Sequence, residues 1–391
     1  MPQSQTRTER PLSGGRQQWA TRAGFLIAGS AMANWAPLVP IAKARIGVDD
    51  GTLGLLLLCL GLGSIVAMPM VGILAGRFGC RAVILASTLV LALVLPLLAV
   101  VDSIPGMAIV LALFGASIGA VDVAINIQAV MVEKDSKRNM MSGFHGLFSV
   151  GGIVGAGGMS LLLGAGTSPW VATLMFSALL LVLLALSTQG LLPYGNQETE
   201  HTPLFTLPRG IVAFIGLLCF LVFLGEGAVL DWSALFLIGT HLVDPAQAGF
   251  GYTMFALAMT AGRLTGDWIV RSLGSMKVVV SGGLLAALGF TLTVLAPNQP
   301  LAFFGFLLVG LGASNIVPVL FTAAGQQTLM PPSQAIAAIT TIGYSGMLVG
   351  PATIGFVAKH WNLSAAFVLI GVGMAFVALT WPLTARHRGK R

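Results

Sequence analysis

The feature that most constrains this chain is a series of long apolar runs separated by short polar breaks. Twelve runs are long enough to cross a membrane as helices, because a hydrocarbon layer of about 30 Å needs about 20 helical residues. Only 8% of the residues are charged, against about 25% in soluble domains. The sequence therefore predicts an all-α membrane protein in a lipid bilayer. Its expected spans are 20–42, 52–76, 82–101, 104–131, 141–164, 168–189, 210–239, 246–269, 275–296, 301–325, 335–358 and 362–384.

The positions of Lys and Arg predict the orientation of the chain. Basic residues concentrate in the cytoplasmic loops of membrane proteins. If both termini are cytoplasmic, 17 of the 20 Lys and Arg residues lie in inner segments, and only Lys43, Arg45 and Lys359 lie in outer loops. We therefore expect a multi-pass protein of the inner cell membrane with both termini in the cytoplasm. The net charge of +7 then reflects orientation and indicates no nucleic-acid partner.

An internal repeat predicts two related bundles of helices. Four pairs of matching stretches keep their order along the chain at offsets of 193–197 residues. The matches are NWAPL (34–38) with DWSAL (231–235), Gly79 with Gly274, GAVD (119–122) with GASN (312–315), and SVGGIVG (149–155) with YSGMLVG (344–350).

The longest polar break, LLPYGNQETEHTPLFTLPRG (191–210), divides the twelve spans into six and six. We expect a cytoplasmic tail at 1–19, a six-helix bundle at 20–190, a cytoplasmic linker at 191–209, a second six-helix bundle at 210–385, and a tail at 386–391. Duplicated bundles of this kind hold a substrate near the middle of the membrane and rock around it.

This organisation resembles the major facilitator superfamily of transporters. The family's loop motif after the second span, G-x-L-A-D-R-x-G-R-R, corresponds to GILAGRFGCR (72–81), with Gly76 where the family usually has Asp. The resemblance implies the major facilitator fold, with twelve transmembrane helices in two pseudo-symmetric six-helix bundles. In the family that Asp helps to latch the cytoplasmic side, so the departure at Gly76 bears on how this chain closes.

Charged residues near the inner ends of the second and eighth spans are candidates for a cytoplasmic gate or latch. In GRLTGDWIVRSLG (262–274), one acid and two basic residues recur every four residues and so share one face of a helix. The latch candidates are Arg77, Arg81, Arg263, Asp267 and Arg271.

Two carboxylates interrupt the apolar seventh span. Glu226 lies at its middle, where an ionised group is costly and is by default a functional candidate. Asp231 lies five residues further out, about 140° around the helix. In the repeat, Glu226 corresponds to Gly29 and Asp231 to Asn34, so only Glu226 lacks a polar counterpart. We interpret Glu226 as a proton-coupling or substrate-binding acid, the alternative being a protonated structural side chain, and we expect Asp231 to be mainly structural.

Asp122 is the second intramembrane acid of interest, and Asn126 shares its helix face. The chain resembles fucose-permease-like sugar–proton symporters, which carry an essential acid on the fourth helix, where Asp122 lies, and another on the first helix, where this chain has Asn34. His145 is a candidate for proton exchange with Asp122, since imidazole titrates near neutral pH, or for a structural hydrogen bond. The candidates for proton coupling or substrate binding are Asp122, Glu226, His145, Asn126, Asn34, Asp231, Asn315 and Tyr344.

These residues favour secondary active transport of a small polar solute, such as a sugar or sugar acid, coupled to protons. The alternatives are proton-antiport efflux of amphipathic or cationic compounds and a membrane receptor that binds without transporting. The sequence holds no metal-ligand cluster, nucleophile motif or nucleotide-binding loop, so we expect no enzyme activity, no metal and no cofactor. We expect the protein to act as a monomer.

Overall fold

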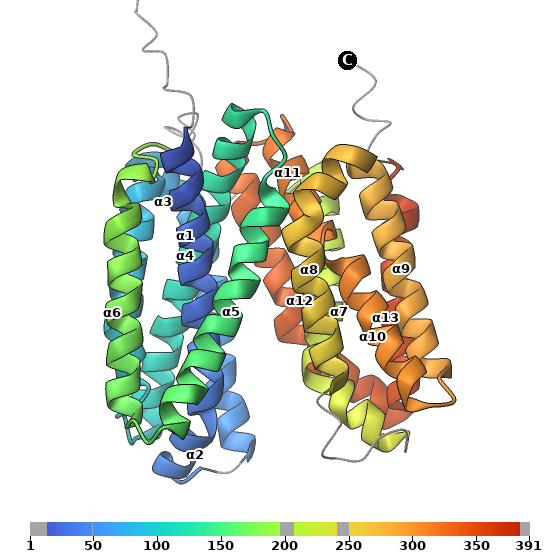
Figure 1. Cartoon of the computed structure of the whole chain (residues 1–391), viewed down its shortest axis with the longest axis horizontal. Coiled ribbons are helices and arrows are strands. Elements are labelled where there is room, and N and C mark those ends of the chain that lie inside the picture. Colours follow the sequence, from blue (N-terminus) through green and yellow to red (C-terminus); the bar gives the residue numbers. More distant parts are fainter. Residues whose placement is uncertain (1–13, 49, 196–206, 241–249, 384–391) are drawn as a thin grey trace, which may run out of the picture.

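The computed structural model of the chain describes residues 14–48, 50–195, 207–240 and 250–383. Two groups of helices lie side by side (Figure 1). The helices of the N-terminal half are α1 (Gly15–Asn34), α2 (Val39–Ile46), α3 (Asp50–Leu97), α4 (Ile104–Ser136), α5 (Met141–Gly164) and α6 (Pro169–Ser187), with short 3₁₀ turns η1 (Ala36–Leu38) and η2 (Thr188–Gly190). The helices of the C-terminal half are α7 (Ile211–Gly239), α8 (Phe250–Leu273), α9 (Ser275–Leu295), α10 (Gln299–Ala313), α11 (Ile316–Gln326), α12 (Pro332–His360) and α13 (Leu363–Thr380).

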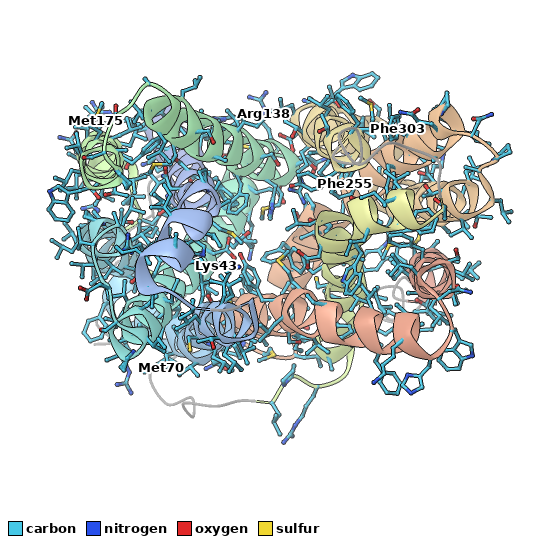
Figure 2. All side chains as sticks on the ribbon, turned by 90° about the horizontal axis from the view of Figure 1, so that it is seen from below. Lys43, Met70, Arg138, Met175, Phe255 and Phe303 are labelled. Atoms are coloured by element: carbon cyan, nitrogen blue, oxygen red, sulfur yellow. The ribbon has the colours of Figure 1, made fainter. Side chains whose placement is uncertain are left out.

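These helices confirm the prediction of an all-α membrane fold. Within the described ranges, nine helical segments are long and apolar enough to cross a membrane. Large apolar side chains also point away from the bundles, including Met70 and Met175, which are 46% and 51% exposed (Figure 2). Lipid tails cover such side chains at no cost. The chain is thus a multi-pass membrane protein.

The internal repeat appears in the backbone as well as in the sequence. Gly79 interrupts α3 with φ 82° and ψ 157°, and its repeat partner Gly274 separates α8 from α9 with φ 80° and ψ 150°. This region of backbone conformation is open essentially to glycine alone. The two halves therefore make the same turn between their second and third expected spans with the same residue type.

The helices run between two ends of the molecule, and we call the end where α1 begins and α13 finishes the inner end (top in Figure 1). The helices α5 and α8 lie close together toward this end and separate toward the other (Figure 1). The expected linker at 191–209 lies partly outside the described residues.

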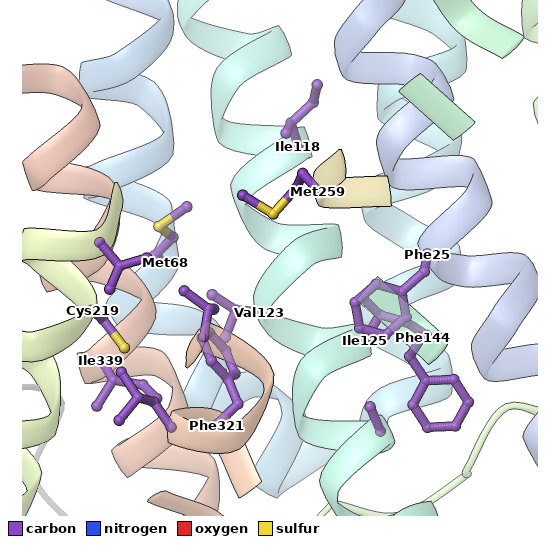
Figure 3. Packing of buried hydrophobic residues seen from close by; sticks show 14 of the residues in the cluster. Phe25, Met68, Ile118, Val123, Ile125, Phe144, Cys219, Met259, Phe321 and Ile339 are labelled. Carbon is purple, nitrogen blue, oxygen red and sulfur yellow. The ribbon is translucent and has the colours of Figure 1, made fainter. Parts of the chain in front are cut away.

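Buried apolar side chains pack both within each half and across the boundary between them. Met68 of α3 lies in the same part of the core as Cys219 of α7 and Ile339 of α12, whereas Phe25 and Phe144 lie together in the N-terminal half (Figure 3). Close helix packing inside a half depends on small residues, as at Gly155, where an added Cβ would collide with the Ser30 carbonyl. The boundary between the halves is the region where charged side chains are also found.

Candidate functional site

The charged centre of the molecule is an ion pair between α7 and α8. Nη2 of Arg263 lies 3.2 Å from Oε1 and 3.3 Å from Oε2 of Glu226 and donates to both. The two side chains are only 9% and 13% exposed. Burying either charge without the other would be costly, so the two side chains neutralise each other in this buried position.

Arg263 is held by groups from both halves of the molecule. Its Nη1 donates to the hydroxyl of Ser149 on α5, at 3.2 Å, and its Nε donates to the Ser314 carbonyl, at 3.4 Å. That carbonyl lies at the break between α10 and α11, and its helical donor would be the N–H of residue 318, which is a proline and has none. The sequence thus leaves one backbone acceptor free for the guanidinium.

Asn315 supports the same break. Its Nδ2 donates to the Gly262 carbonyl and to the Ser314 hydroxyl, both at 3.0 Å. Because Gly262 precedes Arg263 on α8, these bonds tie the α10–α11 break to the segment that carries the guanidinium. Asn315 therefore positions Arg263.

Asp122 forms a second polar group on the other side of the boundary. It is 6% exposed, and the Tyr344 hydroxyl of α12 donates a hydrogen bond to it. Asn126 Nδ2 donates to the Asp122 carbonyl at 2.9 Å and lies 3.4 Å from its Oδ1. The Tyr344 ring packs against Phe223 of α7, with centroids 5.6 Å apart. We call the eight residues together the central polar site: Asp122, Asn126, Ser149, Glu226, Arg263, Ser314, Asn315 and Tyr344.

The two cross-boundary hydrogen bonds are related by the internal repeat. Ser149 on α5 and Tyr344 on α12 are equivalent positions, 195 residues apart. Ser149 reaches Arg263 in the opposite half, and Tyr344 reaches Asp122 in the opposite half. One helix of each half thus contacts a charged or acidic residue of the other.

His145 lies beside the central polar site without joining it. Its ring lies 5.1 Å from Phe25 and 5.6 Å from Phe321, and its Nε2 is buried without a hydrogen-bond partner. The structure places no hydrogen bond between His145 and Asp122 among the described residues. Phe25, His145 and Phe321 form an aromatic layer, and because Phe321 belongs to α11, this layer crosses the boundary between the halves. It lies one helical turn nearer the inner end than Ser149.

The inner end is closed by two further contacts between the halves. Glu133, near the end of α4, accepts hydrogen bonds from the N–H groups of Met140 and Met141 at 2.7 and 2.8 Å, which suit a carboxylate at the start of α5. Its other oxygen accepts from the Thr322 hydroxyl of α11 at 2.5 Å. Glu133 was not identified from the sequence, where it lies eight residues before the predicted start of the fifth span and on the preceding helix.

Asp267 makes the second contact at the inner end. Its Oδ2 accepts from the N–H of Gly143 on α5, at 3.0 Å, so a carboxylate of α8 reaches the N-terminal turn of a helix in the other half. The repeat equivalent of Asp267 is Gly72, which packs closely against Ser333 and Ala337 at the start of α12. Of these two repeat-related contacts at the inner end, one is therefore made by a charged side chain and the other by a small residue.

Among the other latch candidates, only Arg263 lies away from the inner end. Arg263 is not at the inner boundary with Asp267 and Arg271, because one helical turn places it deeper, against Glu226. Arg81 donates to the Leu191 carbonyl at 2.9 Å and so braces its own half. Arg77 and Arg271 are exposed.

The remaining two candidates also lie outside the central polar site. Asn34 is fully buried and donates to the Ser30 carbonyl of its own helix at 2.9 Å. Asp231 is exposed and makes no ion pair with a described residue. In the described part of the chain, His, Cys, Asp and Glu form no group of three that could hold a metal ion.

Comparison with known proteins identifies the kind of molecule to which this geometry belongs. Residues 23–330 match the family model described as Major Facilitator Superfamily. An uncharacterised MFS-type transporter of Yersinia pestis is 55% identical over 362 residues, covering 93% of this chain and 94% of that protein.

Solved structures share the fold at low sequence identity. FucP in the outward conformation superposes with a TM-score of 0.79 at 16% identity, over 95% of this chain and 98% of FucP; a second FucP structure is described as the Escherichia coli fucose:proton symporter. The human organic anion transporter MFSD10 superposes with a TM-score of 0.75 at 17% identity, over 93% of this chain and 98% of that chain.

Proposed function

Because the chain belongs to the major facilitator superfamily of transporters, we propose that it moves a small polar solute by alternating access, coupled to protons. The central polar site holds the solute and the protons. The membrane is the inner cell membrane, with both termini in the cytoplasm, as the bias of Lys and Arg toward the inner segments indicates. The protein works as a monomer.

The observation that carries this proposal is the buried ion pair at the boundary between the halves. Arg263 and Glu226 are joined to the other half through Ser149, so their surroundings change whenever the halves move relative to each other. A proton or a solute that alters this pair therefore alters the balance between conformations, since a ligand shifts an equilibrium by its differential affinity for two states.

The proposed proton sites are Glu226 and Asp122. Both are acids with little exposure, and intramembrane acids in transporters commonly relay protons. His145 lies between the central polar site and the inner end, where it is suited to pass a proton inward once the aromatic layer opens. In this proposal Asn126, Asn315 and Tyr344 orient the charged groups.

The conformation described is closed at its inner end. Three layers there have to separate for the solute to leave inward: the His145–Phe321 contact, the Glu133–Thr322 hydrogen bond and the Asp267–Gly143 hydrogen bond. The similarity to FucP in the outward conformation supports this assignment. Asp267 and Glu133 act as the latch that the first bundle lacks at Gly76.

Import of a sugar-like or anionic solute fits the central polar site better than efflux of amphipathic cations, because the Arg263 guanidinium can donate hydrogen bonds to a hydroxyl or a carboxylate but not to a cation. A fucose:proton symporter and an organic anion transporter are among the structural neighbours, which supports a polar or anionic solute. A receptor without transport is disfavoured because the chain belongs to a superfamily of transporters.

The test is solute-driven proton movement in reconstituted vesicles that contain a pH-sensitive dye. Sugars, sugar acids and lipophilic cations are added outside at equal concentration. We expect a sugar or sugar acid to acidify the lumen through the wild-type protein, and Glu226→Gln and Asp122→Asn to abolish the signal. A signal that only lipophilic cations elicit, or one that both variants retain, refutes the proposal.

A further inference from the structure

We propose that Arg263 binds the carboxylate of an anionic solute and that Glu226 occupies its place when the solute is absent. This inference rests on the proposed function and specifies its substrate class as a small organic acid. The solute's carboxylate displaces the Glu226 carboxylate from the guanidinium, and Glu226 takes up a proton as it leaves.

The geometry of the ion pair favours such an exchange. Arginine binds carboxylates most strongly when two of its nitrogens face two oxygens. Here both oxygens of Glu226 share the single nitrogen Nη2, while Nη1 and Nε bind Ser149 and Ser314. Glu226 therefore holds the guanidinium through one of the weaker arrangements, which a better-placed carboxylate can replace.

The fold itself does not need this pair. At the repeat offset of 195 residues, Arg263 corresponds to Met68, and at the offset of 197 that relates the first and seventh spans, Glu226 corresponds to Gly29. At these positions the N-terminal half has apolar packing in place of an ion pair. Met68 is fully buried, and Gly29 packs against the Phe148 backbone. A buried ion pair contributes little net stability compared with apolar packing, so its presence in only one half indicates a function.

Conservation of charge explains why the proton must accompany the anion. The pair is neutral before exchange, and it stays neutral afterwards only if the displaced Glu226 is protonated. Among the titratable groups, Arg263 of α8 contacts Glu226 directly, and Tyr252 of α8, Tyr344 of α12 and Cys219 of its own helix lie near enough to interact with it electrostatically. The sequences of α10, α11 and α13 contain none. Arg263 is thus the cation that sets the charge balance, and a monovalent anion and one proton cross together without net charge.

The direct test removes the Glu226 carboxylate by mutation and supplies acetate in solution to take its place at Arg263. Glu226→Ala removes a group of the size of acetate. We expect 50 mM sodium acetate at pH 7 to raise the melting temperature of purified Glu226→Ala by roughly 2–4 °C over the same concentration of sodium chloride. Acetamide has no such effect, and acetate has none on the wild-type protein or on Glu226→Ala/Arg263→Gln. Equal responses of Glu226→Ala to acetate and acetamide overturn the inference.

A second variant keeps the test decisive if Glu226→Ala does not fold. Glu226→Gln preserves the side-chain volume and frees the guanidinium. With D-galacturonate and D-galactose as matched probes, we expect the acid alone to stabilise this variant, equally at pH 5.5 and pH 7.5. Stabilisation by galactose alone, by both sugars equally, or by neither overturns the inference.

Failure of this inference is distinguishable from failure of the proposed function. If a neutral solute drives protons into vesicles while acetate leaves Glu226→Ala unchanged, proton-coupled transport stands and Arg263 is not the solute site. If acetate stabilises Glu226→Ala but no solute moves protons, anion binding at Arg263 stands and proton coupling is refuted.

Discussion

In the C-terminal half, α7 and α8 face each other through Glu226 and Arg263, whereas the corresponding positions of the N-terminal half carry Gly29 and Met68. The backbones of the two halves make the same glycine turn at Gly79 and Gly274. The difference shows that equivalent positions of a duplicated scaffold can share a backbone turn and still differ in charge. One half supplies an ion pair, and the other supplies Asp122, which a tyrosine from the opposite half reaches.

The largest expected effect comes from making the C-terminal half resemble the N-terminal half. Arg263→Met leaves Glu226 buried without its cation, so we expect it to lower the free energy of unfolding by about 3–5 kcal/mol and to abolish transport. Glu226→Gly/Arg263→Met copies the N-terminal pattern and recovers most of that stability but no transport. Thermal melting and vesicle uptake measure both. A double variant that melts no higher than Arg263→Met would show that the fold depends on the ion pair.

Removing the acid of the N-terminal half tests whether the two halves share the work. Asp122→Asn keeps an acceptor for Tyr344 and removes the ability to ionise. We expect proton-driven accumulation to fall by about 100-fold, the scale of removing a proton-transfer group, with little change in melting temperature. Asn126→Asp, which adds an acid one turn away, serves as the control for local charge. Full accumulation by Asp122→Asn would leave Glu226 as the sole proton site.

Gly79 and Gly274 have the same backbone conformation but different neighbours, so substitutions at the two positions can be compared. Gly79→Ala and Gly274→Ala both strain the backbone, by about 1–3 kcal/mol. An added Cβ at Gly79 also meets the Pro193 carbonyl, whereas nothing lies within 4 Å at Gly274. We therefore expect Gly79→Ala to have the lower melting temperature of the two. The reverse order would contradict the packing described for α3.

The smallest expected effect concerns the closure of the inner end. Thr322→Val removes the hydroxyl that donates to Glu133, so the closed state should lose about 0.5–1.5 kcal/mol. Thr340→Val is the matched control, because the Thr340 hydroxyl bonds only within its own helix. Labelling of a cysteine introduced at Met141 should become several-fold faster in Thr322→Val and unchanged in Thr340→Val. Equal rates in the two variants would remove Glu133 from the latch.

Sequence patterns predicted the helices well because apolar length is a local property. The fifth expected span, 141–164, has the same bounds as α5, and the matched Gly79 and Gly274 lie at equivalent turns of the two halves. The tenth span was expected to be continuous, but it is two helices, α10 and α11. The sequence features that indicate this break are Pro318, which has no N–H to donate, and Ser314 and Asn315, which lie between the two helices.

The central polar site could be predicted only in part. Glu226 and Asp122 could be identified because an acid within an apolar transmembrane segment is costly and usually functional. Arg263 was grouped with Asp267 because four-residue spacing places them on one face, yet one turn of helix is about 5.4 Å of depth and separates the ion pair from the inner end. Its partner Glu226 is 37 residues away, and the rotation of one helix against another depends on packing that no local pattern encodes.

The most direct test of proton coupling at Glu226 compares two modes of transport by Glu226→Gln in the same vesicles. Exchange of labelled for unlabelled solute needs only movement of the loaded site, whereas accumulation against a gradient needs the proton. We predict that Glu226→Gln exchanges solute within about threefold of the wild-type rate, on the order of RT ln 3 or 0.6 kcal/mol, but accumulates none when the outside is acidified. Accumulation equal to that of the wild-type protein would contradict the account.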